Sequence, residues 1–218
     1  MLLMNNYEKQ CILKKEDVAG IGPWIWIAND GGHDGGAWGG PKQDFENSHY
    51  HAYKKHIEKW DVVVQAGGCQ GMYPRLFSEM FGRVYTFEPD PLNFFVLTIN
   101  CQRDNIIKMQ TALGAENKLI TVSRNSPQNY GMHTISERQQ FIPMIKLDTL
   151  NLDACDFIQL DVEGYEIFAL RGAEETIKKF KPVISCERGN REIIDFLTPF
   201  GYTAVEQTMM DTIYKINK

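Results

Sequence analysis

Residues 61–90 read DVVVQAGGCQGMYPRLFSEMFGRVYTFEPD, and this stretch decides the fold. An apolar run at its start predicts a strand, which leads into three glycines: Gly67, Gly68 and Gly71. A helix-like stretch follows, and a second predicted strand ends on Glu88. Glycines let the backbone approach a ligand, a helix start presents free N–H groups, and an acid can bind ribose hydroxyls. The stretch therefore predicts a site for an adenosine-containing cofactor.

The spacing of the acid supports this interpretation. Glu88 lies 21 residues after Gly67, close to the separation of about 20 residues expected in such a site. The glycines GGCQG alone are a weak signal, because glycine-rich strand ends often only form tight turns. A solvated strand-end carboxylate is the alternative for Glu88, and the combination favours a ribose contact.

Strand-like and helix-like segments alternate from residue 61 to the end of the chain. Short β-rich apolar runs between helices predict an α/β fold with a parallel sheet covered on both faces. The expected strands are Val62–Gln65, Val84–Phe87, Ile107–Ala112, Phe157–Leu160 and Val183–Cys186. The expected helices are Met72–Phe81, Pro91–Cys101, Gly164–Phe180 and Glu192–Phe200. The tail, with TAVEQT and DTIYKIN, is expected to form a final hairpin at the sheet edge.

Two regions break the alternation. Residues 1–58 form an N-terminal extension ahead of a domain expected at 59–218, with a helix-like stretch at 50–60. The tryptophans of the extension are expected either to cover a substrate or to form an oligomer contact: Trp24, Trp26 and Trp38. Residues 115–147 are an insertion of the kind that carries substrate specificity on loops.

Composition excludes several classes of protein. A net charge of −5 and a pI near 5.6 argue against a broad nucleic-acid-binding face. The five cysteines are odd in number and lack CxxC spacing, which predicts reduced thiols. The first residues are too poor in apolar side chains for a signal peptide, and no apolar run approaches the roughly 20 residues of a membrane span. We therefore expect a cytoplasmic protein that binds neither nucleic acid nor a membrane.

A second group of acids follows later strands. DFIQLDVEGYE (residues 156–166) places Asp161 and Glu163 at the carboxyl end of a buried strand, and CERGN places Glu187 after the next one. Ligands of open α/β sheets bind at this edge, so these carboxylates are expected to face the same cleft as the glycine turn. The alternatives are a first-turn helix acid for Glu163 and an ion pair with Arg188 or Arg191 for Glu187.

The histidines give a weaker signal. His133, in the insertion, is either a base or substrate contact or a solvent-exposed loop histidine, and the second interpretation is favoured. The other histidines lack the i, i+4 spacing of a helical zinc site, so no metal centre is predicted among them: His33, His49, His51 and His56.

Seven segments occur in a recognisable order: VVVQAGGCQGMY, FEPDP, TALG, IKLDTL, DFIQLDVEGYE, LRGA and KPVISCE. With them the chain resembles the FkbM-type S-adenosylmethionine-dependent methyltransferases over roughly residues 60–190; FEPDP and DVEGYE with LRGA are the most specific segments. The resemblance implies a Rossmann-like fold with a mostly parallel seven-stranded sheet, whose last strand is antiparallel. It also implies methylation of a hydroxyl group on a sugar, glycan or natural-product-like small molecule.

The resemblance further implies roles for particular residues. Those implied to bind S-adenosylmethionine are Gln65, Gly67, Gly68, Gly71, Tyr73, Glu88, Pro89, Ala112 and Asp161. Catalysis is expected from Asp161, Glu163 or Glu187 as the base, with Mg²⁺ bound by such carboxylates as an alternative. Gln65 stands where the family usually has an Asp that helps to bind the cofactor's ammonium group, and it lacks that charge.

Two other functions remain open at this point. A nicotinamide-dependent oxidoreductase also fits the glycines and Glu88, although the chain lacks an obvious second catalytic domain and DVEGYE has no role there. A catalytically silent binding protein is the other, because Gln65 replaces the usual acid.

Overall fold

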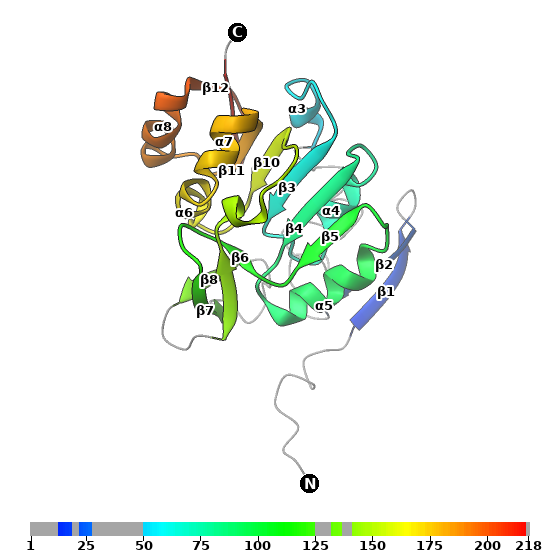
Figure 1. Cartoon of the computed structure of the whole chain (residues 1–218). Helices are drawn as coiled ribbons and strands as arrows, with labels where there is room; N and C mark the ends of the chain where they lie inside the picture. The colour runs from blue at the N-terminus through cyan, green and yellow to red at the C-terminus, as the bar shows by residue number, and fades with distance from the viewer. Residues whose placement is uncertain (1–12, 19–21, 28–49, 125–131, 137–140, 217–218) are drawn as a thin grey trace.

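The computed structural model describes residues 13–18, 22–27, 50–124, 132–136 and 141–216 (Figure 1). Its main sheet has seven strands in the order β12-β13-β11-β10-β3-β4-β5. From β11 to β5 all neighbours pair in parallel, whereas β13, the last strand of the chain, is antiparallel to both of its neighbours. The strands are β3 (Val62–Ala66), β4 (Arg83–Phe87), β5 (Ile106–Met109), β10 (Phe157–Leu160), β11 (Val183–Glu187), β12 (Tyr202–Gln207) and β13 (Asp211–Ile216). The predicted α/β architecture and final hairpin are confirmed.

Helices cover both faces of this sheet, as Figure 1 shows. One face packs against α6 (Glu166–Arg171), α7 (Glu174–Phe180) and α8 (Arg191–Leu197). The other face packs against α3 (Tyr50–Lys54), α4 (Met72–Phe77) and α5 (Pro91–Asn100). The central strand β3 is buried along its whole length, as a doubly covered sheet requires: Val64 faces the first layer and Val63 the second.

Three predicted helices are shorter than expected. The helix predicted to end at Phe81 ends at Phe77, and the helix-like stretch at 50–60 is helical only as far as Lys54. Beyond Leu197 the chain continues as a short 3₁₀ helix, η2 (Thr198–Phe200).

The expected strand Ile107–Ala112 is wrong in its second half. The chain leaves the main sheet after Met109, and Ala112 begins β6 (Ala112–Leu113) in a separate four-stranded sheet, ordered β6-β9-β7-β8. Its other strands come from the predicted insertion: β7 (Lys118–Arg124), β8 (His133–Ser136) and β9 (Ile142–Ile145). A 3₁₀ helix, η1 (Leu147–Leu150), leads back to the main sheet.

The single helix expected from Gly164 to Phe180 is also wrong, because Gly172 separates α6 from α7. A Cβ atom at Gly172 would lie 2.0 Å from the carbonyl oxygen of Gly114, so the small sheet approaches the chain closely at this break. Asp148 caps the N-terminus of α7. Its carboxylate accepts hydrogen bonds from the backbone N–H groups of Glu175 and Thr176, at 3.0 and 2.9 Å.

The N-terminal region contributes an unpredicted hairpin, β1 (Leu13–Val18) and β2 (Gly22–Ile27). Trp24 and Trp26 are buried on β2, with Trp24 fully covered, so both belong to the packed interior of the protein. The Asn100 side chain hydrogen-bonds to both backbone groups of Ile25, which ties β2 to α5. Trp38 lies outside the described residues.

None of the described helices combines the length and the apolar character that crossing a bilayer requires.

Candidate functional site

The glycine turn follows β3 and touches the end of β10. The backbone N–H groups of Gly67 and Gly68 both donate to the carbonyl oxygen of Phe87, at 3.1 and 3.0 Å, which joins the turn to β4. Gly67 has a φ of +84°, and a Cβ atom there would lie 1.8 Å from the carbonyl oxygen of Asp161. Only glycine fits this position, because both its left-handed backbone and the neighbouring strand exclude a side chain.

Glu88 lies beside this turn, at the end of β4, and is 5% exposed. Its two carboxylate oxygens accept hydrogen bonds from the backbone N–H groups of Cys69, at 2.7 Å, and Asp90, at 2.8 Å. Burial raises the pKa of Glu88 to about 8, even though the two N–H donors act in the opposite direction. Each carboxylate oxygen retains lone-pair capacity, so the group can still accept hydrogen bonds from a diol.

Gln65 uses both ends of its side chain inside the protein. Its Nε2 donates to the carbonyl oxygen of Gly67 at 2.9 Å, and its Oε1 accepts from the Thr86 hydroxyl at 2.6 Å. The residue is completely buried. In this arrangement Gln65 braces the glycine turn against β4, which carries Thr86.

Asp161, Glu163 and Glu187 come together at the carboxyl ends of β10 and β11. One carboxylate oxygen from each lies within 4.8 Å of the others, so we call these three residues the acid cluster. Burial, followed by the charges of Glu187 and Asp211, raises the pKa of Asp161 well above its usual value. Burial is also the largest cause of the raised pKa values of Glu163 and Glu187. The predicted meeting of these acids at one edge is found.

The structure answers the two alternatives raised by the sequence. Glu163 precedes α6, so it is not an acid of the first helical turn; that position belongs to Glu166. Glu166 serves the loop itself: its Oε1 accepts hydrogen bonds from the N–H groups of Val162 and Gly164, at 3.1 and 3.2 Å. Glu187 does pair with Arg188, at 3.3 Å, but the arginine side chain is 67% exposed and the glutamate side chain only 9%. An exposed partner of this kind stabilises a carboxylate only weakly.

The backbone at this edge is strained. Cys69, Glu163 and Arg188 have φ values of +45°, +53° and +48°, in the left-handed region that side chains disfavour. They follow β3, β10 and β11 respectively. Asn151 and Lys181, the other described non-glycine residues with positive φ, end helices, where this conformation is common. Strain concentrated at one sheet edge is typical of functional sites.

His133 reaches the same edge from the insertion. Its Nδ1 lies 3.4 Å from the Asp90 carboxylate, and its side chain is 7% exposed. The expectation of a solvent-exposed loop histidine is therefore wrong. Asp90 also caps α5 by accepting hydrogen bonds from the N–H groups of Leu92 and Asn93. The histidine thus packs on the turn that carries Glu88.

The remaining predicted cofactor residues lie on α4, directly after β4, and on β6. Tyr73 is partly buried on α4, with its ring centroid 6.4 Å from that of Tyr53. Pro89 follows Glu88 directly, and Ala112 begins β6 and is buried. Gly71 precedes α4 with a φ of +100°.

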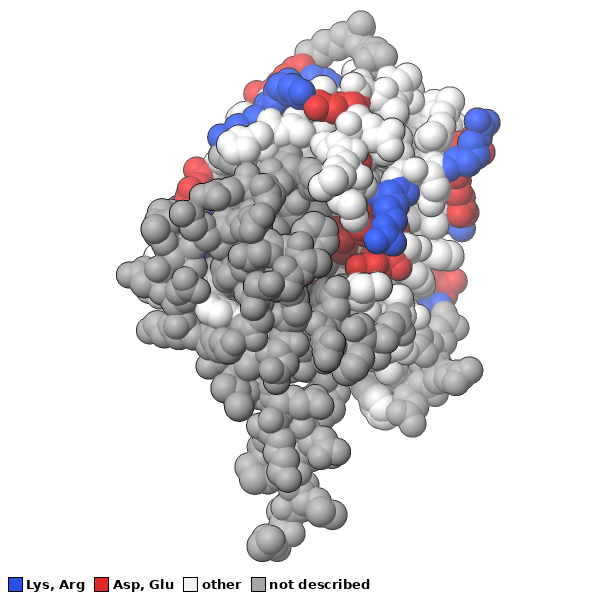
Figure 2. Space-filling model, turned by 180° about the vertical axis from the view of Figure 1, so that it is seen from behind, with Lys and Arg blue, Asp and Glu red and all other residues white. Residues whose placement is uncertain are grey.

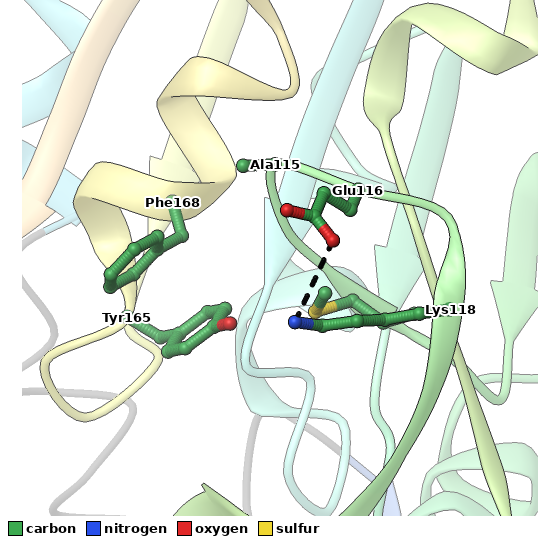
Figure 3. Close-up of a pocket in the computed structure, with 6 residues that line it drawn as sticks. Ala115, Glu116, Lys118, Tyr165 and Phe168 are labelled. Carbon is green, nitrogen blue, oxygen red and sulfur yellow. Dashed lines mark ion pairs between the residues drawn. The ribbon is translucent and has the colours of Figure 1, made fainter. Parts of the chain in front are cut away.

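A cavity of about 230 Å³ lies between α6 and the small sheet (Figure 3). The rings of Tyr165 and Phe168 stack on one side, with centroids 4.5 Å apart, and the ion pair of Lys118 and Glu116 lies opposite them. Tyr165 is two residues from Glu163, so the cavity adjoins the loop of the acid cluster. This cavity could not be predicted from the sequence, because its walls come from separate parts of the chain.

Charges are mixed on the face opposite to that of Figure 1. Figure 2 shows acidic and basic side chains interspersed over the described part of this face. This distribution differs from the single-sign field typical of a polyanion-binding surface.

The chain is similar to known methyltransferases in sequence and in fold. The profile of the Methyltransferase FkbM domain matches residues 65–204, which is more than half of the chain. No curated protein sequence matches. The fold is similar to the crystal structure of Methyltransferase FkbM from Methylobacillus flagellatus KT, with a TM-score of 0.51 and 18% identity. That match covers 81% of this chain and 53% of the other, so the chain spans about half the length of that protein.

A further solved structure shares the fold. Trm5b from Pyrococcus abyssi matches with a TM-score of 0.50 and 11% identity, over 95% of this chain and 57% of the other. A SAM-dependent methyltransferase from Aquifex aeolicus matches with a TM-score of 0.47 and 12% identity, over 81% of this chain and 94% of the other. The two similarities with TM-scores of 0.51 and 0.50 confirm the predicted Rossmann-like methyltransferase fold. With its sequence matched over residues 65–204, the chain belongs to the FkbM methyltransferase family.

Proposed function

We propose that the protein is an S-adenosylmethionine-dependent methyltransferase that methylates a hydroxyl group of a small molecule or glycan. The observation that carries this proposal is the position of two acidic sites on either side of one glycine turn. Glu88 lies beside the turn at the end of β4, and Asp161 contacts Gly67 from the end of β10.

These residues fit the proposed cofactor chemically. A buried carboxylate with remaining lone pairs suits the two hydroxyls of a ribose, which is the role we assign to Glu88. Pro89 and Ala112 would border the adenine, and Tyr73 the methionine end of the cofactor. Because Gln65 is engaged with Gly67 and Thr86, we assign the ammonium group to Asp161 and a supporting role to Gln65.

When bound, S-adenosylmethionine supplies a methyl group attached to a positively charged sulfur. The protein has to orient an acceptor hydroxyl and remove its proton. A hydroxyl group loses its proton far above neutral pH, so a base with a raised pKa is better matched to this task than an ordinary carboxylate. Burial is the largest cause of the raised pKa of Glu187, and we assign the base to this residue, while Asp161 binds the ammonium group of the cofactor.

The cavity beside α6 supports an acceptor that carries a ring. Its stacked aromatic wall can pack against the apolar face of a sugar or an aromatic ring, while Lys118 and Glu116 can hydrogen-bond to hydroxyls. This arrangement favours a small polyhydroxylated acceptor.

The test is formation of S-adenosylhomocysteine from S-adenosylmethionine with a panel of monosaccharides, glycosides and phenols. We expect at least one acceptor to be methylated, and Glu187→Gln to lower turnover by about 10²-fold or more while the variant stays folded. A protein that binds S-adenosylmethionine but methylates no hydroxyl compound, and methylates amines instead, would contradict the proposed acceptor class. Turnover by Glu187→Gln equal to that of the wild type would remove the assigned base.

A further inference from the structure

A row of buried polar side chains crosses the main sheet one step before the candidate site. Its members pair with one another across neighbouring strands, in the order β4, β3, β10 and β11. None is more than 1% exposed: Thr86, Gln65, Gln159 and Ser185. Polar side chains are costly to bury unless hydrogen bonds compensate them, so the partner of each member shows what it does.

The polar row lies between the apolar core and the site. Alternate residues of a strand share one face, so the preceding residues on this face belong to the core: Val84, Val63, Phe157 and Val183. Two residues further along each segment come residues of the site: Glu88, Gly67, Asp161 and Glu187. Gln159 therefore stands two residues before Asp161, and both side chains leave the backbone on the same face.

Three members of the row have partners inside the protein. The Thr86 hydroxyl donates to Oε1 of Gln65 at 2.6 Å, and Nε2 of Gln65 donates to the Gly67 carbonyl at 2.9 Å. The Ser185 hydroxyl donates to the Asp211 carboxylate at 3.1 Å. The side-chain groups of these three residues are thus already engaged.

Gln159 differs from its neighbours in the row. Its Oε1 is completely buried and accepts no hydrogen bond within the part of the chain that the structure describes. A buried acceptor without a donor lowers the stability of the folded state, so its presence points to a donor on a bound group. Gln159 is 1% exposed and Glu88, assigned above to the ribose, is 5% exposed. Both are therefore covered to a similar degree.

The ammonium group of the proposed cofactor is a donor of the required kind. An ammonium has three N–H donors, so complete pairing needs more than one acceptor. Asp161 supplies a carboxylate, whereas Gln65, where the family usually has an acid, uses both ends of its side chain inside the protein. Gln159 offers the additional acceptor on the same strand as Asp161.

Two tyrosines connect this face of the sheet with the proposed methionine end of the cofactor. The Tyr53 ring centroid lies 5.0 Å from that of Phe157, which is two residues before Gln159. Tyr73, assigned above to the methionine end, has its ring centroid 6.4 Å from that of Tyr53. Both tyrosines pack with the second layer of helices, so Tyr73 and Gln159 lie on the same side of the sheet.

We propose that Gln159 binds the ammonium group of S-adenosylmethionine together with Asp161, and that it replaces part of the function of the acid usual at position 65. The proposal rests on the proposed function, because it assigns a further residue to the same cofactor site. It gives the Gln159 side chain two measurable properties: it destabilises the free protein and stabilises the complex.

The test is calorimetric titration of the whole chain and of Gln159→Met, an unbranched apolar substitution, with three adenosyl ligands. S-adenosylhomocysteine has the amino and the carboxylate group, decarboxylated S-adenosylmethionine has only the amino group, and methylthioadenosine has neither. We expect Gln159→Met to bind the first two ligands about tenfold or more weakly than the wild type, because a hydrogen bond to a charged group is lost. Its affinity for methylthioadenosine should be unchanged.

Urea unfolding of the free protein gives the second readout. Because Gln159→Met removes an unpaired buried acceptor, its unfolding midpoint should equal or exceed that of the wild type. If this variant does not fold, Gln159→Leu takes its place.

Two further variants serve as controls. Gln159→Glu keeps an acceptor oxygen and should retain the preference for S-adenosylhomocysteine over methylthioadenosine. Ser185→Ala is the matched control from the same row. It removes a hydroxyl that donates to Asp211, so it should lower the unfolding midpoint and leave the ligand preference unchanged.

The outcomes separate this inference from the proposed function. A wild-type preference for S-adenosylhomocysteine over methylthioadenosine that persists in Gln159→Met would overturn the inference and leave the cofactor assignment intact. A lower unfolding midpoint in both apolar variants would also overturn it, because Oε1 would then be paired in the free protein, for example by an internal water. Weaker binding of S-adenosylhomocysteine alone would place Gln159 at the carboxylate and contradict the ammonium contact. Failure of the wild type to bind any of the three ligands would refute the proposed function and this inference with it.

Discussion

Gly67 and Gly164 offer a matched pair for testing how the site is built. Both have the left-handed backbone, with φ values of +84° and +89°. A Cβ atom at Gly67 would lie 1.8 Å from the carbonyl oxygen of Asp161, whereas at Gly164 it would meet nothing within 4 Å. Replacing each by alanine therefore imposes the same backbone strain, and only Gly67→Ala adds a collision between two strands.

The expected losses of stability follow from the backbone strain and from the collision. A left-handed non-glycine residue costs about 1–2 kcal/mol, and this is the whole effect expected for Gly164→Ala. In Gly67→Ala the end of β10 has to move by more than 1 Å to reach an ordinary contact, which adds about 1–3 kcal/mol of overpacking. The movement is resisted because the Asp161 N–H is hydrogen-bonded to the Ala66 carbonyl at 3.1 Å. We therefore expect Gly67→Ala to lose about 2–5 kcal/mol in total.

Urea unfolding of both variants at neutral pH measures the difference directly. We expect Gly67→Ala to be the less stable by at least 1 kcal/mol and to bind S-adenosylmethionine more weakly, because the turn is displaced. Equal losses of stability in the two variants would refute the contact between the glycine turn and Asp161.

Three further predictions concern stability. Burial raises the pKa of Glu88 to about 8, so the folded state binds this proton more tightly than the unfolded state does. The stability that Glu88 contributes should be complete below about pH 4.5 and be lost as the pH rises towards 8. The loss, at most about 5 kcal/mol, should be absent in Glu88→Gln, and parallel urea-unfolding profiles of the two proteins between pH 5 and 8 would disprove it. Gln65→Leu removes the side-chain hydrogen bonds to the Gly67 carbonyl and the Thr86 hydroxyl, so the free energy of unfolding should fall by about 2–4 kcal/mol in the same assay. A fall of less than about 0.5 kcal/mol would exclude the bracing role. Trp24→Ala empties a fully buried position, so the free energy of unfolding should fall by about 3–5 kcal/mol and proteolysis of the N-terminal hairpin should become faster. An unchanged free energy of unfolding would mean that this hairpin does not unfold cooperatively with the rest of the protein.

The central sheet could be predicted from the sequence because its signals are local. Phe157–Leu160 is a short apolar run bounded by polar residues, and the structure has the same boundaries. The predicted acids meet because the carboxyl ends of parallel strands share one edge, so their order along the chain was enough.

The errors arise where distant segments decide the structure. The chain leaves the main sheet after Met109 because Ala112 pairs with Met144, more than 30 residues away. Gly172 interrupts a helical pattern because the Gly114 carbonyl approaches it. Neither contact can be read from a local pattern of residues, and tertiary contacts override helix propensity.

The same reason explains the missed parts of the site. His133 belongs to a polar segment that looks like an exposed loop, and its burial depends on the contact with Asp90. The hydrogen bonds of Gln65 to Gly67 and Thr86 depend on the register of β3 and β4, which the sequence does not specify.

The most direct test of the account is calorimetric titration of the wild-type protein and Glu88→Ala with S-adenosylmethionine, S-adenosylhomocysteine and NAD⁺. The account predicts micromolar binding of both adenosyl sulfur compounds by the wild type, with binding lost or greatly weakened in Glu88→Ala. It also predicts no comparable binding of NAD⁺. Binding of NAD⁺ in preference to the sulfur compounds, or equally tight binding of S-adenosylmethionine by Glu88→Ala, would contradict the assignment of this edge as the cofactor site.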